Sequence, residues 1–203
     1  MRARKSKPVL KVKARVSANE PFSRYVAPIL RATLFGSPLI HFRLRRLADL
    51  KPGQKVLELA AGPVPYHKIW QNKLGRNGEL VVSDYSDWIT AKNRALSKVS
   101  VFRKPQVSHK SIDLNKIEGY TNYFDRIIVV SPFGFGTLKG VERALRPGGK
   151  ALLFIYMDPA TPKSKVQEFL NVKDTSLEIE KQGWHDTILL DHHCYILLRK
   201  PEK

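Results

Sequence analysis

The sequence predicts an α/β fold, a doubly wound and mostly parallel sheet closed by an antiparallel C-terminal hairpin. A run of mainly β-branched residues, Arg126 to Val130, suits a central parallel strand that is buried on both faces. Short apolar runs alternate with helical segments between residues 51 and 156, as in repeated βαβ units. Two further apolar runs, 184–190 and 194–198, are separated by three residues, which is too few for a parallel crossover.

The expected elements follow from turn signals and hydrophobic patterns along the chain. Before the hairpin we expect five strands, at 55–60, 79–83, 106–112, 126–130 and 151–156. Between them we expect helices at about 65–74, from residue 86 onward, and at 137–146. The last of these helices is expected to stop at the turn Arg146-Pro147-Gly148-Gly149.

Charge and turn signals divide the chain into three regions. Residues 1–16 are a basic arm, residues 17–50 a helical extension, and residues 51–203 the α/β domain. A capping box, Ser17-Ala18-Asn19-Glu20, begins the extension, and Gly36-Ser37-Pro38 starts its second helix. This second helix has an apolar face and a basic one; the apolar face holds Leu39, Ile40, Leu44 and Leu47, while Arg43, Arg45 and Arg46 lie largely off it.

The net charge of +18, with a pI near 10.1, predicts a polyanionic partner such as nucleic acid, a ribonucleoprotein or an acidic membrane surface, and RNA or a ribonucleoprotein is the partner we expect. Residues 1–50 hold 12 Lys and Arg against two acids, so the N-terminal region is the expected contact. The arm 1–16 has two other interpretations, a solvated tail and a mitochondrial targeting segment.

Several classes of site and location are disfavoured by composition. No apolar run reaches the ~18 residues of a membrane span; the nearest, 26–42, is interrupted by Arg31, Gly36 and Pro38. The single Cys194 excludes an internal disulfide and favours the cytoplasm or another reducing compartment. His192 and His193 are adjacent and point in opposite directions, so we expect no metal site.

The stretch 56–66 is the candidate ligand loop. It is a short buried strand that ends in small residues and leads into a helix, where backbone N–H groups are open to a ligand. Asp84 follows the next strand, 22 residues after Gly62, which is close to the ~20-residue spacing of nucleotide-binding βαβ units. A carboxylate there would accept hydrogen bonds from ribose hydroxyls; the structural alternative is that Asp84 caps the next helix.

Three motifs, together with the terminal hairpin, resemble the class I S-adenosylmethionine-dependent methyltransferases over residues 38–200. They are the lead-in to the first motif (51–59), the second strand with its terminal acid (78–86) and the turn before the fifth strand (144–150). The resemblance implies a seven-stranded, Rossmann-like sheet and S-adenosylmethionine as cofactor. In the first motif this chain keeps one glycine, Gly62, and Ala60 replaces another, which is tolerable if its φ is negative.

Carried over to this sequence, the resemblance assigns roles to single residues. Glu58 and Gly62 would lie at the methionine end of the cofactor and Asp84 at the ribose, and Ala60 and Tyr85 are further cofactor-binding candidates. The adenine would lie beside Asp113 and Leu114, and Ser131 would face the transferred methyl group. The polar residues expected near the methyl acceptor, and therefore the catalytic candidates, are Ser131, Asp113 and Tyr85.

The resulting hypothesis is a methyltransferase that acts on RNA or a ribonucleoprotein. Methyl transfer is an in-line displacement at a sulfonium, so the protein mainly positions two reactants. One alternative is a catalytically inactive, methyltransferase-like factor that binds RNA or ribosomes or assists assembly. Another is a small-molecule or lipid methyltransferase whose apolar segment 26–42 covers the substrate.

Overall fold

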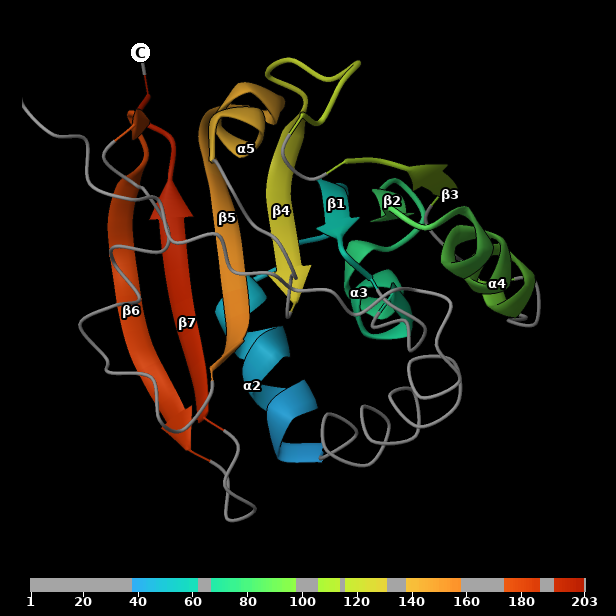
Figure 1. Cartoon of the computed structure of the whole chain (residues 1–203), viewed down its shortest axis with the longest axis horizontal. Helices are drawn as coiled ribbons and strands as arrows, with labels where there is room; N and C mark the ends of the chain where they lie inside the picture. The colour runs from blue at the N-terminus through green and yellow to red at the C-terminus, as the bar shows by residue number, and fades with distance from the viewer. Residues whose placement is uncertain are drawn as a thin grey trace, which may run out of the picture.

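The structure, a computed structural model, describes residues 38–61, 67–97, 106–113, 116–130, 138–157, 174–186 and 192–202. Within these ranges one sheet has the strand order β3-β2-β1-β4-β5-β7-β6 (Figure 1). Its strands are β1 (Lys55–Leu59), β2 (Glu79–Asp84), β3 (Gln106–Ser111), β4 (Phe124–Val130), β5 (Leu145–Met157), β6 (Glu178–Asp186) and β7 (His192–Arg199). Strands β1 to β5 pair in parallel and β7 pairs antiparallel with β5 and β6, which confirms the predicted fold class.

The predicted central strand is β4, which pairs with β1 on one side and β5 on the other. All seven of its residues are buried. A strand that is covered on both faces needs no polar alternation, and this is why the run from Ile127 to Val130 is apolar throughout. Asp125 is held by two partners: the backbone N–H of Lys55 donates to its Oδ2 at 2.7 Å, and Arg146 pairs with its Oδ1 at 2.7 Å.

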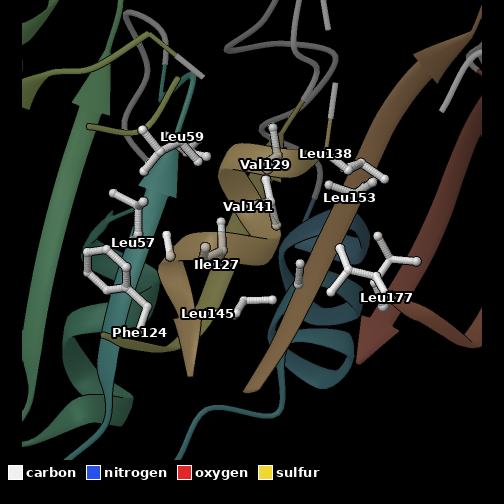
Figure 2. Close-up of a cluster of buried hydrophobic side chains, with 14 of the residues drawn as sticks. Leu57, Leu59, Phe124, Ile127, Val129, Leu138, Val141, Leu145, Leu153 and Leu177 are labelled. Atoms are coloured by element: carbon white, nitrogen blue, oxygen red, sulfur yellow. The ribbon is translucent and has the colours of Figure 1, made fainter. Parts of the chain in front are cut away.

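Helices cover both faces of the sheet, so the sheet is doubly wound. They are α2 (Pro38–Ala48), α3 (His67–Leu74), α4 (Asp87–Ser97) and α5 (Lys139–Ala144). One apolar cluster joins strand residues such as Leu57 and Leu153 to Val141 of α5, as Figure 2 shows. A second cluster joins Val56 of β1, Leu80 of β2 and Ile128 of β4 to α2 and α3. Adjacent strand residues enter different clusters because side chains alternate across a strand.

Two predicted boundaries around the fifth strand were wrong. Helix α5 ends at Ala144 rather than at 146, and β5 begins at Leu145 rather than at 151. The residues that indicated a turn do bend the chain, since Gly148 has a φ of +71° and the β4–β5 register shifts there. However, Gly148 and Gly149 also exchange backbone hydrogen bonds with Lys200, so the bend is a bulge within a strand.

The first strand of the terminal hairpin begins earlier in the sequence than predicted. Strand β6 spans Glu178–Asp186, whereas the sequence predicted 184–190. Its first five residues are all exposed, so this edge strand carries no apolar alternation that sequence patterns could detect. Backbone pairing with β7 defines it instead.

Parts of the N-terminal prediction lie outside the described residues. The basic arm 1–16 and the helix predicted from the capping box at 17–20 are among them, and the domain boundaries stay predictions. The second helix of the extension is α2, and its predicted apolar face is confirmed at Leu44, which is fully buried. None of the described helices combines the length and the hydropathy needed to cross a membrane.

Candidate functional site

The carboxyl ends of β1, β2, β3 and β4 meet at one edge of the sheet because these strands are parallel. Backbone hydrogen bonds continue past the strand ends. The N–H of Ala61 donates to the Ser83 carbonyl at 3.0 Å, and the N–H of Ile112 donates to the Asp84 carbonyl at 3.2 Å. The segments that leave β1 and β3 are therefore held against the end of β2, between them.

Glu58 is the buried acid of this edge. It is the penultimate residue of β1, and none of its surface is exposed. The Ser83 hydroxyl donates to its backbone carbonyl at 3.0 Å, which ties β1 to β2 at this level. Burying a carboxylate costs free energy, so such a residue at the end of a central strand is typical of a functional position.

Ala60 turns the chain out of β1 with a φ of +54°. The sequence interpretation tolerated alanine here on the condition of a negative φ, and that condition is not met. An L-residue in the left-handed region costs roughly 1–2 kcal/mol, and glycine is the usual occupant. The turn that the glycine-rich motif normally makes is thus present, although its residue is not glycine.

Asp84 ends β2, and its side chain is half-buried. Its Oδ1 accepts a hydrogen bond from the backbone N–H of Ser86 at 3.0 Å, just before α4 begins. The structural alternative from the sequence, a role at the start of the helix, is therefore part of what Asp84 does. A carboxylate has about four acceptor positions, so this bond is compatible with a ribose contact.

Tyr85 and Asp113 are the next two candidates at the same edge. The Tyr85 side chain is 76% exposed, and its backbone carbonyl accepts from the Ser111 hydroxyl at 3.1 Å. Asp113 follows β3, and its carbonyl accepts from the N–H groups of Lys116 and Ile117 at 3.0 and 2.9 Å. The fold thus brings Glu58, Ala60, Asp84, Tyr85 and Asp113 to the ends of three adjacent strands.

Three predicted site residues, Gly62, Leu114 and Ser131, lie outside the described residues. In sequence each directly follows a described residue of this edge. Their roles, and the catalytic assignment of Ser131, Asp113 and Tyr85, stay predictions.

The opposite edge of the sheet also has a hollow, but its chemistry is different. A depression of about 470 Å³ is lined by Pro52, Gly53, Leu74, Gly75, Arg76 and Asn77, and none of these residues carries a carboxylate. Within the described part of the chain, no three or more His, Cys, Asp or Glu side chains come together as a metal site would require. The carboxylates at the carboxyl edge therefore mark the candidate site.

Sequence reasoning missed the hydroxyl groups that hold this edge together. Ser83 is 1% exposed and bonds to the Glu58 carbonyl, while Ser111 bonds to the Tyr85 carbonyl. A serine at the end of an apolar strand gives no sequence signal of its partner, because that partner is the backbone of another segment. Only the pairing of the strands shows it.

Solved structures share this architecture. A methyltransferase of Aquifex aeolicus, described as dependent on S-adenosylmethionine, superposes with a TM-score of 0.63 at 15% identity, covering 86% of this chain and 97% of its own. TrmN from Thermus thermophilus superposes with a TM-score of 0.64 at 21% identity, covering 89% of this chain and 54% of its own. This chain has the fold of the class I S-adenosylmethionine-dependent methyltransferases. The methyl donor of the superfamily's enzymes is S-adenosylmethionine.

The curated relatives that match this chain in sequence are also methyltransferases by name. The ubiquinone/menaquinone biosynthesis C-methyltransferase UbiE of Laribacter hongkongensis is 28% identical over 141 residues, or 66% of this chain and 55% of the relative. UbiE of Cupriavidus metallidurans is 27% identical over 137 residues, or 62% of this chain and 53% of the relative. The chain spans about half the length of the curated relatives it matches. No family model matches the chain.

Proposed function

We propose that this chain binds S-adenosylmethionine at the carboxyl edge of its sheet and catalyses methyl transfer to RNA or to a ribonucleoprotein. The observation that carries the proposal is the alignment of acids at that edge. Glu58, Asp84 and Asp113 lie at the ends of β1, β2 and β3, in the order in which these strands neighbour one another. This is the arrangement expected for a nucleoside cofactor laid across the strand ends.

The described residues fit the nucleoside part of the cofactor. Asp84 would accept hydrogen bonds from the ribose hydroxyls, and it stays oriented by the N–H of Ser86. The positive-φ turn at Ala60 would carry the chain away from the edge and leave room for the ligand. When bound, the cofactor supplies an electrophilic methyl group on its sulfonium; Tyr85, Asp113 and Ser131 would orient the acceptor.

The RNA part of the proposal rests on charge. The chain carries +18, and most of the excess lies in residues 1–50. A positive net charge of this size attracts a polyanion and has no evident use in the capture of a small neutral acceptor. We therefore favour RNA as the acceptor or as part of it.

A small-molecule acceptor is the second candidate, and one observation favours it. The curated relatives are named for C-methylation in ubiquinone and menaquinone biosynthesis, which points to a small apolar aromatic acceptor. A third candidate, an inactive binding factor, is favoured by the alanine at position 60, where the turn requires a positive φ.

The cofactor site can be tested with two matched substitutions. Asp84→Asn removes the charge yet keeps an oxygen that can accept from Ser86, so the strand end should stay folded. We expect isothermal calorimetry to show at least about a tenfold loss of S-adenosylmethionine affinity, since each 1.4 kcal/mol is tenfold. Asp87→Asn removes an exposed acid three residues away and should bind as the wild type does.

Acceptor choice needs a separate measurement. The protein would be incubated with labelled S-adenosylmethionine and either cellular RNA or a small demethylated quinol. Label in RNA supports the proposal, label only in the quinol supports the second candidate, and cofactor binding without transfer to either supports the inactive factor. Deletion of residues 1–16 should weaken RNA binding and flatten its dependence on salt.

A further inference from the structure

Helix α2 has one buried face and one exposed face that combines an aromatic ring with two guanidinium groups. Leu44 and Ala48 are 0% and 1% exposed and pack into the second apolar cluster. Phe42, Arg45 and Arg46 are exposed, Phe42 by 67%. Since residues at i, i+3 and i+4 are neighbours on a helix, these three side chains form one surface, which we call the Phe42 face.

The Phe42 face lies level with the carboxyl edge of the sheet. The guanidinium carbon of Arg43 lies 5.2 Å from the centre of the Tyr195 ring. Tyr195 pairs with Phe154 of β5, and Phe154 pairs with Val130, the last residue of β4. Arg43, next to Phe42, therefore lies at the same level along the strands as the carboxyl end of β4. In the view of Figure 1, α2 extends past the arrowheads of β1 and β4.

The Phe42 face lies away from the part of the carboxyl edge that would bind the cofactor. Asp84 lies on β2, whereas Tyr195 lies on β7, on the other side of β1 in the sheet order. From β1 to β7 there are three strand spacings of about 4.8 Å, or about 14 Å in all. A chain bound on the Phe42 face could therefore extend along the edge toward the methyl-transfer site without covering the ribose carboxylate.

The charge of α2 is entirely of one sign. The helix contains no acidic residue, and no ion pair within the described residues engages Arg45 or Arg46. A single exposed apolar side chain is common on protein surfaces. An exposed ring one helical turn from two arginines is more specific, because nucleic-acid surfaces combine rings that stack on bases with cations that contact phosphates.

We propose that the Phe42 face binds a single-stranded stretch of RNA. Phe42 stacks on an unpaired base, and Arg45 and Arg46 contact the phosphates beside it. Unpaired bases are required because a duplex hides its base faces within the stack. This inference rests on the proposed RNA acceptor and names the surface that would hold it.

An anionic membrane is the rival partner, and the composition of the face argues against it. Interfacial helices insert a broad apolar face into the lipid. Here the other described apolar residues of α2, Leu44, Leu47 and Ala48, contribute to the core. Among the α2 residues whose side chains the structure describes, Phe42 is the one exposed apolar group, which suits stacking on one base better than insertion.

The stacking contact is tested by fluorescence anisotropy with a labelled, unstructured 20-nucleotide RNA. Phe42→Ala should weaken binding about 5- to 150-fold, the range given by about 1–3 kcal/mol per stacked base. Phe42→Trp should bind at least as tightly as the wild type. The matched control is Ile179→Ala, which removes another exposed apolar side chain, on β6, and should change nothing. Unchanged binding in Phe42→Ala overturns the proposal.

The phosphate contacts are tested with two double variants that change net charge equally. Arg45→Gln with Arg46→Gln should reduce the slope of log affinity against log salt by about 1.4, or about 0.7 per phosphate contact. The control, Lys73→Gln with Arg76→Gln, removes two exposed cations at and just after the end of α3, near the amino edge, and should leave the slope unchanged. An equal reduction by both pairs would mean that only net charge matters and would overturn the proposal.

Two further readouts separate this inference from its rivals. If Phe42→Ala abolishes binding to vesicles containing anionic phospholipid and leaves RNA binding intact, the face is a membrane contact and the proposal is wrong. If the wild type methylates RNA and Phe42→Ala does so equally well with unchanged affinity, the proposed function stands and only the Phe42 face is misassigned. If the RNA binds through Phe42 but never receives label, the acceptor in the proposed function is wrong.

Discussion

At the scale of single residues, Ala60 has a backbone conformation that is unfavourable for a residue with a side chain. The residue turns the chain out of β1 at a φ of +54°, where a Cβ atom is strained. Its neighbour Ala61 is buried, and its φ is not positive. The same substitution to glycine should therefore act in opposite directions at these two adjacent positions.

Ala60→Gly should raise the free energy of unfolding by about 0.5–1 kcal/mol. The relief of roughly 1–2 kcal/mol of strain exceeds the entropic cost of glycine and the loss of a partly buried methyl group. Ala61→Gly is the control, and it should lower the free energy of unfolding by about 1 kcal/mol or more. No strain is relieved at this position, while the variant carries the entropic cost of glycine and loses a buried methyl group. Urea unfolding measures both; a loss of stability in Ala60→Gly equal to that in Ala61→Gly would contradict the assignment of strain.

His109 on β3 links stability to pH. Partial burial lowers the pKa of His109 from its usual 6.5, and the charge of Arg94 on α4 lowers it further. The unfolded chain therefore takes up this proton before the folded one. As pH falls from above 6.5 through the lowered folded pKa, the stability associated with neutral His109 is lost.

We expect His109→Gln to be less sensitive to acid than the wild type. Comparing urea unfolding at pH 7.5 and pH 5 isolates the contribution of His109, because all other groups are shared by the two proteins. The wild type should lose more stability than the variant over this range. An equal loss in both proteins would show that His109 has the same pKa in the folded and unfolded states.

At the scale of elements, the contact of α2 with the sheet depends on a glycine in a different strand. Gly183 of β6 pairs with Tyr195 of β7, and a Cβ atom at position 183 would lie 2.5 Å from the Tyr195 hydroxyl and 2.7 Å from its ring. The ring can lie across β6 because residue 183 has no side chain. It is then held in place for the Arg43 guanidinium above it.

Gly183→Ala should lower stability by about 1–3 kcal/mol, the usual cost of overpacking. In a Tyr195→Leu background the same change should cost much less, so a double-mutant cycle should give a coupling above about 0.5 kcal/mol. Lys181→Ala, on the exposed part of the same strand, should change stability by less than about 0.5 kcal/mol. Additive effects of Gly183→Ala and Tyr195→Leu would show that the ring does not occupy this space.

At the scale of the whole molecule, stability should follow the order of strands in the sheet. Strand β4 is buried along its length and pairs on both sides, whereas β3 is an edge strand whose described side chains are exposed or half-buried. Amides of β1, β4 and β5 should therefore exchange most slowly with deuterium, and those of β3 should exchange first. Equal protection in β3 and β4, measured by mass spectrometry of peptides, would contradict this hierarchy.

The sequence by itself determined the fold class and the places of most elements. Continuous apolar strands such as β4 must be buried on both faces, and turn residues separate them at short intervals. It also singled out Asp84, through its place after a strand and its spacing from Gly62, and the family resemblance added Glu58 and Asp113. What it could not supply was the conformation of Ala60, since φ depends on how the chain leaves the sheet.

Only the tertiary structure decided which residues act together. The start of the edge strand β6 was predicted too far along the sequence, because an exposed strand is defined by pairing with its partner and not by apolar alternation. Ser83, Gly183 and Tyr195 carry no local signal, since each acts on a segment distant in the chain. The basic face of α2 could be predicted from the helical spacing of its apolar residues, but its position level with the end of β4 follows only from the pairing of β4, β5 and β7.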